Sequence, residues 1–255
     1  MLVLLPPSEG KAPGGDGPPL DLAGLSRPGL TPVRERLVDA LVHAARSDPE
    51  GLRRALGCTP GQAGEVERDA ALRDSPTLPA LQRYTGVVYD ALGYATLTSP
   101  AKRRADASLL VVSALFGLVG PRDRVPAYRL SGGTSLPGVG ALAALWRPVL
   151  EPELAATRGL VVDLRSGAYA ALARVPAAVT VRVLRESGGR RTVVSHDNKH
   201  TKGRLARLLC QQGARSVAGV AEAGRACADD VEVHGRAVDL VLHGLATARV
   251  APPGS

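Results

Sequence analysis

The sequence predicts a single compact α/β (α+β) domain built around a mixed sheet with flanking helices. Short, continuous apolar runs at 2–5, 109–115 and 159–164 are typical of buried strands. Segments with helix start signals lie between these runs, and no internal repeat or linker divides the chain. We therefore expect one domain over residues 1–250, followed by a flexible tail at 251–255.

The composition narrows the class of protein. The 255 residues are 45% hydrophobic and 22% charged, which supplies a core and argues against a disordered chain. No apolar run approaches the roughly 20 residues of a membrane helix, so no membrane partner is expected. Three cysteines, odd in number and without metal-ligand spacing, indicate buried thiols in a reducing cytoplasm. We expect a cytoplasmic protein without a metal or cofactor, and its oligomeric state stays open.

Helix start signals place the helices of the first half of the chain. Thr31-Pro32, Asp48-Pro49 and Ser99-Pro100 each combine a capping residue with proline at the first helical position. Thr59 to Gln62 has the pattern of a capping box before another helix. Residues 81–94 look helical with a break near Gly86, and the Pro/Gly-rich residues 6–30 are expected to be irregular.

The second half of the chain predicts further helices and strands. Helices are expected over 138–150 and after Gly167. Segments 179–185 and 191–195 look like paired strands joined by Ser187-Gly188-Gly189, and a helix is expected to begin at His200 or Thr201. Segments 214–224 and 231–246 suggest further strands.

The net charge of +8 indicates a polyanionic partner, either DNA or an anionic small molecule. Only four of the 32 basic residues are lysines, namely Lys11, Lys102, Lys199 and Lys202. Lysine is a compact charge that can lose its proton, whereas arginine stays protonated. We hypothesise that Lys11, Lys199 and Lys202, which lie in motif-like stretches, perform a task that arginine does poorly. The alternative is that all four are ordinary surface lysines.

The first such stretch, PPSEGK, follows the apolar run Leu2–Leu5. It is not a P-loop, because that loop needs glycine at the position of Leu5 and Ser or Thr at the position of Ala12. Ligands of α/β sheets collect at the carboxyl ends of strands, so Ser8, Glu9 and Lys11 are candidate catalytic residues there. A mobile loop without a function is the alternative.

The second stretch, SHDNKHTKGRLARLL, leads from a predicted strand into a helix. The partial positive charge of a helix N-terminus adds to that of its basic side chains, which predicts an anion site. His196 and Lys199 are candidate catalytic groups, and the candidate ligand-binding residues are Ser195, Lys202, Arg204 and Arg207. A polar capped turn with a solvated basic face is the alternative. Metal binding by His196 and His200 is disfavoured, because their spacing would matter only on a helix.

Two further stretches could contact an anion. In VSALFGLVGPRDRVPAYRL, a buried strand runs into glycines and basic residues, so Arg122, Tyr128 and Arg129 are candidate binding residues; a tight turn with a salt bridge is the alternative. In SLPGVGALAALW, the glycines Gly138 and Gly140 precede an Ala-rich helix. This spacing is similar to a helix-hairpin-helix element, whose backbone N–H groups contact DNA phosphates. A glycine-capped helix start is the alternative.

These stretches, in this order, resemble the YaaA family (DUF328/UPF0246) of bacterial peroxide-stress proteins, over essentially the whole chain. The resemblance rests on LLPPSEGK, YTGVVYDAL, VVSALFGLVGPRDRVPAYRL, Leu145-Trp146, DLRSGAYAAL and SHDNKHTKG. It implies a mixed α/β fold with a positively charged cleft, DNA binding, and protection from hydrogen peroxide by limiting free iron. The motif positions that it implies are Ser8, Lys11, Tyr84 to Tyr89, Ser113, Gly117, Pro126, Tyr128, Arg129, Trp146, Ser195, Lys199, Lys202 and Gly203.

The chain departs from the family pattern at three places. Glu9 adds a carboxylate to the first loop, His196-Asp197 replaces an aromatic pair, and His200 replaces a second lysine. These changes exchange stacking groups for groups that handle protons. The alternative to a DNA-binding stress protein is therefore an enzyme on a nucleotide or other anionic or heteroaromatic small molecule, in a specialised biosynthetic pathway. In either case we expect Ser8, Glu9, Lys11, Tyr128, Arg129, Ser195 and Lys199 to line one concavity.

Overall fold

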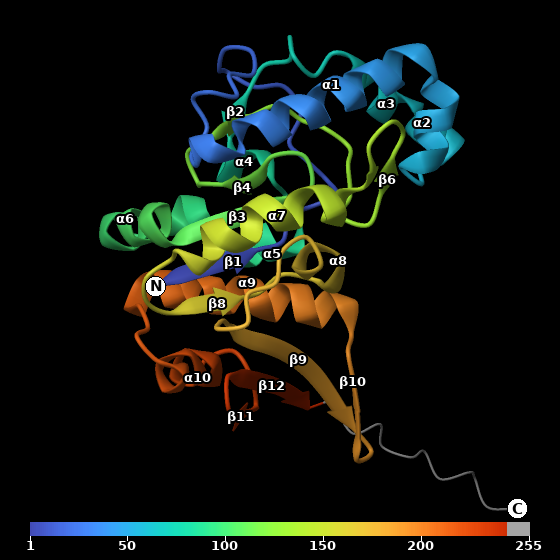
Figure 1. Cartoon of the computed structure of the whole chain (residues 1–255). Coiled ribbons are helices and arrows are strands. Elements are labelled where there is room, and N and C mark those ends of the chain that lie inside the picture. Colours follow the sequence, from blue (N-terminus) through green and yellow to red (C-terminus); the bar gives the residue numbers. More distant parts are fainter. Residues whose placement is uncertain (244–255) are drawn as a thin grey trace, which may run out of the picture.

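The computed structural model describes residues 1–243 and confirms the predicted α/β class. Within these residues, one eight-stranded mixed sheet crosses the molecule in the order β11-β12-β9-β8-β1-β3-β4, with β10 also paired to β9 (Figure 1). Its parallel strands are β1 (Leu2–Leu5), β3 (Leu109–Ser113), β8 (Val161–Asp163), β9 (Val179–Ser187) and β12 (Ala237–His243). The antiparallel strands are β4 (Gly117–Val119), β10 (Arg190–Thr192) and β11 (Asp230–His234). The predicted tail at 251–255 lies outside the described residues.

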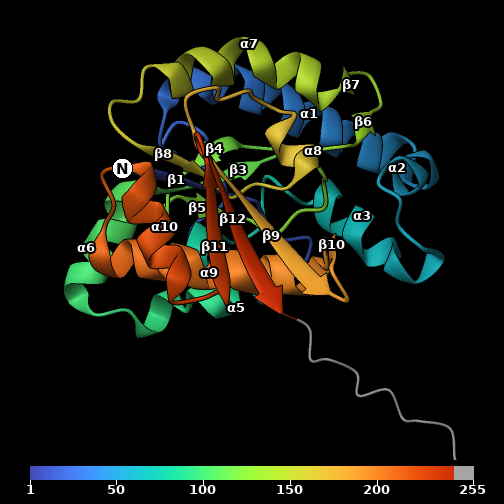
Figure 2. The same cartoon turned by 90° about the horizontal axis from the view of Figure 1, so that it is seen from below.

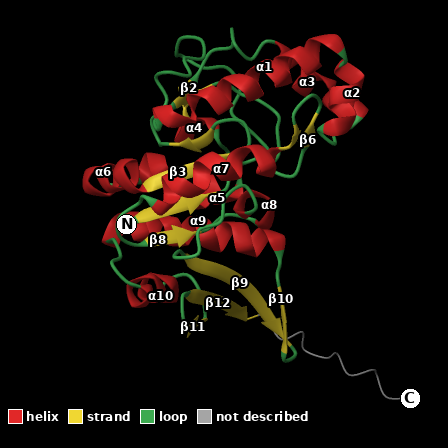
Figure 3. Cartoon of the chain, in the orientation of Figure 1, coloured by secondary structure: helices red, strands yellow, loops and turns green. Residues whose placement is uncertain are grey.

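Helices cover both faces of the sheet. Figure 2 shows α7 (Leu142–Ala155) on one side, and α5 (Val87–Leu92), α6 (Ser99–Ser108), α9 (Ser195–Gln212) and α10 (Val217–Arg225) on the other. Beyond β4 lies a helical layer, in which α1 (Thr31–Ser47) packs against α2 (Pro49–Ala55) and α3 (Ala63–Ala70) (Figure 3). The short elements are α4 (Ala80–Arg83), α8 (Gly167–Ala170) and the two-stranded ribbons of β2 (Leu78–Pro79) with β5 (Arg124–Val125) and β6 (Ser135–Leu136) with β7 (Gly140–Ala141).

The strand order creates a topological switch point. From β1 the chain moves to β3 on one side, and it later returns to β8 on the other side of β1. The connections that leave β1 and β8 therefore diverge, which opens a crevice outside the carboxyl ends of the two strands. Residues 2–5 are all buried and apolar, as expected for a central parallel strand.

Most predicted helix starts are confirmed. Asp48 caps α2 by accepting a hydrogen bond from the Gly51 amide at 2.9 Å, and Thr59 and Gln62 form a capping box. The segment 81–94 breaks as predicted into α4 and α5, and the break falls at Gly86, whose φ of 92° favours glycine.

Two predictions about the chain beyond residue 194 were wrong. Helix α9 begins at Ser195, not at His200 or Thr201, because its polar first turn is held from outside: Asp197 accepts a hydrogen bond from Arg185 of β9 at 2.7 Å. Segment 214–224 mostly forms helix α10 rather than a strand. Its buried residues recur at helical spacing, and Ser216 caps it by accepting from the Gly219 amide.

The PGVG stretch is a turn between β6 and β7, with Gly138 and Gly140 at φ values of 75° and 87°. Helix α7 follows this hairpin, but the element that precedes the PGVG turn is strand β6 and not a helix. The predicted helix-hairpin-helix-like arrangement is therefore wrong in its first half, and the predicted helix begins at Leu142 instead of residue 138. Two glycines with positive φ close together favour a tight β-hairpin turn over a helix start.

Two buried side chains fasten the sheet to the helices around it. The Trp146 indole of α7 donates a hydrogen bond to the Ala114 carbonyl at 2.8 Å, and its ring lies where a Cβ on Gly117 would come within 2.7 Å. Arg34 of α1 is fully buried, and its guanidinium donates to the carbonyls of Phe116 and Leu118 at 2.9 and 2.8 Å. Both contacts lie at β4, so the helical layer and the sheet share one core.

All three cysteines are buried and none is in a disulfide. Among the residues described, no helix combines the length and apolar character needed to cross a membrane.

Candidate functional site

A cavity of about 560 Å³ lies at the switch point and is the strongest candidate site in the described part of the chain. Three segments form its walls: the loop after β1, the segment from β8 into α8, and the first two turns of α9. Residues 85–89 close another side. We call it the switch-point cavity, and its lining residues are Pro6, Pro7, Ser8, Glu9, Gly10, Thr85, Gly86, Val87, Val88, Tyr89, Ser131, Gly133, Leu164, Ser166, Ala168, Tyr169, Ser195, Asn198, Lys199 and Lys202.

The loop after β1 is held by hydrogen bonds from the neighbouring segment. Ser8 Oγ accepts a bond from the Thr85 amide at 3.0 Å, and the Tyr89 hydroxyl donates to the Pro6 carbonyl at 2.7 Å. Glu9 is exposed, and its carboxylate lies 3.2 Å from the Arg129 guanidinium. The loop therefore presents a hydroxyl and a carboxylate on a fixed backbone.

Helix α9 contributes four polar side chains from one face. Ser195, Asn198, Lys199 and Lys202 are spaced by three, four and seven residues, so they lie along the same side of the helix. Lys202 is only 8% exposed, and its ammonium donates to the Arg165 carbonyl at 3.3 Å. Burial lowers the pKa of Lys202, while Asp163 opposes that shift. A nearby anion would stabilise this buried charge.

The third wall follows β8. Arg165 turns back on Asp163, donating two side-chain hydrogen bonds of 2.8 and 2.7 Å to its carboxylate. This ion pair is almost fully buried, and it fixes the backbone that leads to Ser166 and Tyr169. Ser166 therefore lines the same cavity as the loop of Ser8, from the neighbouring strand end.

Lys11 lies outside the lining of the switch-point cavity. Its ammonium donates to the carbonyls of Ser8 and Glu9 at 3.0 and 3.3 Å and sits 4.2 Å from the centre of the Tyr128 ring. Burial lowers the pKa of Lys11 to about 8, and Asp69 opposes that shift. Burial in turn raises the pKa of Asp69 to about 8, and its Oδ2 has no hydrogen-bond partner in the described residues. Lys11 therefore holds the backbone of the loop after β1 in place without lining the cavity.

The predicted site residues divide into two groups. Ser8, Glu9, Ser195, Lys199 and Lys202 line one cavity, so the two predicted loops do meet there. The expectation that Lys11, Tyr128 and Arg129 share this lining was wrong, because Tyr128 is buried behind the loop and its hydroxyl lies 2.7 Å from Ser113 Oγ.

The remaining candidates lie elsewhere. His196 is exposed and stacks on His200, one turn further along α9. Arg204 donates to the Ala226 carbonyl, Arg207 to the carbonyls of Leu92 and Gly93, and Arg122 pairs with Asp106 at 2.6 Å. Gly138 and Gly140 lie in the hairpin between β6 and β7 and do not line the cavity.

Sequence reasoning missed several lining residues, including Tyr169 and Ser166, and it named Thr85 only within the family motif Tyr84 to Tyr89. Ser166 could have been found by the rule applied to Ser8, since it too follows a buried strand directly. Thr85 lies in the break between α4 and α5, and Tyr169 lies in α8, so only the fold brings them to the strand ends.

The fold and cavity define an open, mostly parallel α/β protein with a lysine-bearing cavity at its switch point. The model of the peroxide stress protein YaaA family matches residues 1–226, and the chain belongs to this family. It is 52% identical over 221 residues to the UPF0246 protein SCO2297 of Streptomyces coelicolor, covering 84% of each chain. It is 46% identical over 250 residues to the UPF0246 protein CE1889 of Corynebacterium efficiens, covering 95% of this chain and 99% of that one.

Proposed function

We propose that the switch-point cavity binds a small anionic molecule of about nucleotide size. The observation that carries the proposal is the pair Lys199 and Lys202 on one face of α9, in a cavity that the hydroxyls of Ser166 and Ser195 also line. Ammonium groups and hydroxyls are the partners that phosphate and carboxylate groups require. The volume of about 560 Å³ is in the range of small-molecule sites.

Ligand binding can be tested with adenosine monophosphate, inorganic phosphate and adenosine as probes in calorimetry. We expect the two anions to bind and adenosine to bind at least about tenfold more weakly than the monophosphate, a difference of about 1.4 kcal/mol. Lys202→Met should weaken the binding of adenosine monophosphate by about tenfold or more, because it removes a buried charge. Arg190→Gln removes the same unit of charge from an exposed residue outside the cavity and should leave affinity within about twofold. Equal losses in both variants, or no anion binding, would refute the proposal.

An enzymatic form of this proposal assigns acid/base chemistry to Glu9 and Lys199, since both line the cavity and His196 does not. Native mass spectrometry of the purified protein would show whether a ligand is retained. Conversion of that ligand by the wild type, but not by Glu9→Gln, would establish turnover.

A second candidate function is sequence-tolerant DNA binding in the cytoplasm, in a peroxide-stress response that limits free iron. The net charge of +8 and the exposed Pro137-Gly138 turn of the β6–β7 hairpin favour it. Binding to duplex DNA should weaken steeply with salt, because phosphate contacts release counterions. Absence of any shift at low salt would refute it. Survival of a deletion strain in hydrogen peroxide, complemented with wild type or Lys202→Met, would show whether the cavity serves the stress response.

A further inference from the structure

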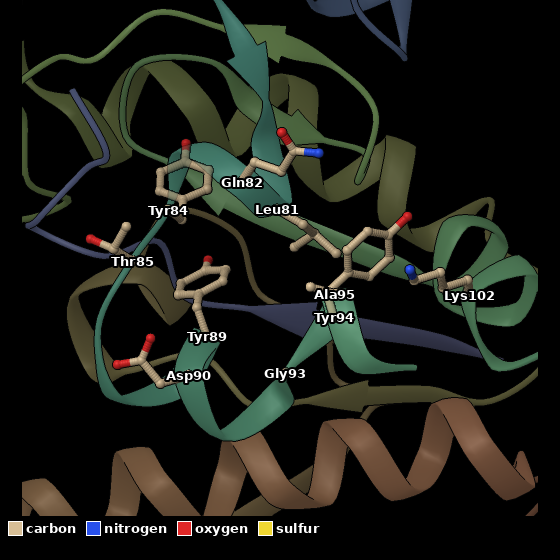
Figure 4. Close-up of a pocket in the computed structure, with 10 residues that line it drawn as sticks. All are labelled: Leu81, Gln82, Tyr84, Thr85, Tyr89, Asp90, Gly93, Tyr94, Ala95 and Lys102. Atoms are coloured by element: carbon tan, nitrogen blue, oxygen red, sulfur yellow. The ribbon is translucent and has the colours of Figure 1, made fainter. Parts of the chain in front are cut away.

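A second cavity, of about 460 Å³, lies on the other side of residues 84–89 (Figure 4). We call it the tyrosine cavity, and its lining residues are Leu81, Gln82, Tyr84, Thr85, Tyr89, Asp90, Gly93, Tyr94, Ala95 and Lys102. Only Thr85 and Tyr89 also line the switch-point cavity. It takes its remaining residues from α4, α5, the turn after α5, and α6, so it is a separate candidate site.

Three aromatic rings dominate the lining. Tyr84 and Tyr89 stack with ring centres 5.6 Å apart, and Tyr94 lies across from them, with Leu81 and Ala95 between (Figure 4). Each tyrosine hydroxyl is already engaged: Tyr84 with Tyr128 at 3.0 Å, Tyr89 with the Pro6 carbonyl at 2.7 Å, and Tyr94 with Asp106 at 2.6 Å. Tyr84 and Tyr89 are only 1% and 7% exposed, so they form the buried floor of the cavity, and half-buried Tyr94 is the ring that an occupant can reach. An apolar floor beside an accessible ring favours a planar aromatic group.

One end of the tyrosine cavity carries a positive charge that no carboxylate neutralises. The Lys102 ammonium lies 5.8 Å from the centre of the Tyr94 ring, and no acidic group among residues 1–243 comes within 4.0 Å of it. The nearby Asp106 is paired with Arg122 at 2.6 Å and accepts from Tyr94. Asp90 lies at the opposite end of the lining, beyond Tyr89 (Figure 4).

We propose that the tyrosine cavity is a second ligand site, which takes a small planar aromatic molecule carrying an anionic group. The ring packs against Tyr94, over the floor that Tyr84 and Tyr89 form, and the anion pairs with Lys102. The negative charge of Asp90 at the far end sets the orientation, because an anion is repelled there and attracted at Lys102. This site is independent of the anion site proposed for the switch-point cavity.

The five tyrosines of the chain give a direct readout of which cavity is filled. Tyr84 and Tyr94 line only the tyrosine cavity, Tyr169 lines only the switch-point cavity, and Tyr89 lines both. The protein is labelled with 3-fluorotyrosine, its ¹⁹F resonances are assigned with single Tyr→Phe variants, and 2-naphthoate is titrated. We expect the Tyr84 and Tyr94 resonances to shift; a shift of Tyr169 in addition would report that this carboxylate also enters the switch-point cavity. A shift of Tyr169 alone, or of none, overturns the proposal.

Charge and shape are tested with matched probes and variants. 2-Naphthylmethanol keeps the rings without the charge, and we expect it to bind at least about fivefold more weakly than 2-naphthoate. Cyclohexanecarboxylate keeps the charge without the aromatic ring and should give no shift. Lys102→Gln should weaken the binding of 2-naphthoate about fivefold or more, whereas Arg190→Gln, which removes an exposed charge outside both cavities, should leave it within about twofold. Five dispersed resonances in free Lys102→Gln would confirm its folding, and equal affinities for naphthoate and the alcohol would overturn the role of Lys102.

Discussion

Gly203 allows helices α5 and α9 to approach closely, and Gly203→Ala tests how far the cavity depends on that contact. A Cβ at this position would lie 2.3 Å from the Val88 carbonyl oxygen and 2.7 Å from Ala91 Cβ. Ordinary contacts begin near 3.4 Å, so α9 would have to move by about 1 Å. Overpacking of this kind costs about 1–3 kcal/mol, and the better helix propensity of alanine returns up to about 1 kcal/mol. We expect a net loss of about 1–2 kcal/mol in the free energy of unfolding.

The assay is urea unfolding followed by circular dichroism, with Gly64→Ala as the matched control. Gly64 lies in α3, and no heavy atom comes within 4 Å of a Cβ built there. The control should be unchanged or up to about 1 kcal/mol more stable. Val88 of α5 and Lys202 of α9 both line the switch-point cavity. A displacement of α9 should therefore also weaken the binding of adenosine monophosphate. A Gly203→Ala protein as stable as the wild type would refute the close-contact argument.

Three further predictions concern buried polar groups and the cavity lysine. Burial raises the pKa of Asp69 to about 8, so its protonated form stabilises the fold and the free energy of unfolding should fall as pH rises from about 4 to 8. Asp69→Asn should remove this fall in urea titrations, and exposed Asp74→Asn should retain it. Tyr128→Phe should cost about 1–3 kcal/mol, since it removes the partner of the buried Tyr84 hydroxyl and leaves Ser113 Oγ only the Leu115 and Phe116 amides from which it accepts. A double-mutant cycle with Ser113→Ala should show the two positions to be coupled. Lys199→Arg should keep low-salt DNA binding within about twofold while abolishing anion binding in the cavity, because the arginine fork does not fit a pocket shaped for an ammonium group. An equal, large loss in both binding assays would contradict separable roles.

Local signals predicted much of the fold. Start signals that contain proline located α1, α2 and α6, although of these three helices only α2 has a capping hydrogen bond, accepted by Asp48. Apolar runs located β1, β3 and β8, because these signals act within a few residues. The start of α9 could not be found this way. Its first turn is stabilised by Arg185 from a strand ten residues earlier, and polar residues such as His196 and Asn198 carry no helical pattern of their own.

The site was predictable only where it follows strand ends. Ser8 and Glu9 were found because they directly follow β1, and Lys199 and Lys202 because lysine is rare in this chain. Lys11 was placed in the cavity by its proximity in sequence, but its side chain turns under Tyr128 to reach backbone carbonyls. Sequence spacing does not report which way a long side chain turns from a loop.

Arg34 has a consequence for the behaviour of the protein in concentrated solution. Strand β4 ends one side of the sheet, and such a margin is a template on which another copy could add a strand. The Arg34 guanidinium covers the Phe116 and Leu118 carbonyls, the acceptors that an added strand would need. At the opposite margin, β11 carries Glu232, which pairs with Arg191 at 2.7 Å. Because Arg34 holds α1 over β4, and all three residues of that strand are buried, the β4 margin is closed to another copy. Arg34→Met should therefore leave two buried carbonyls without these donors and lower the free energy of unfolding, rather than open β4 to strand addition.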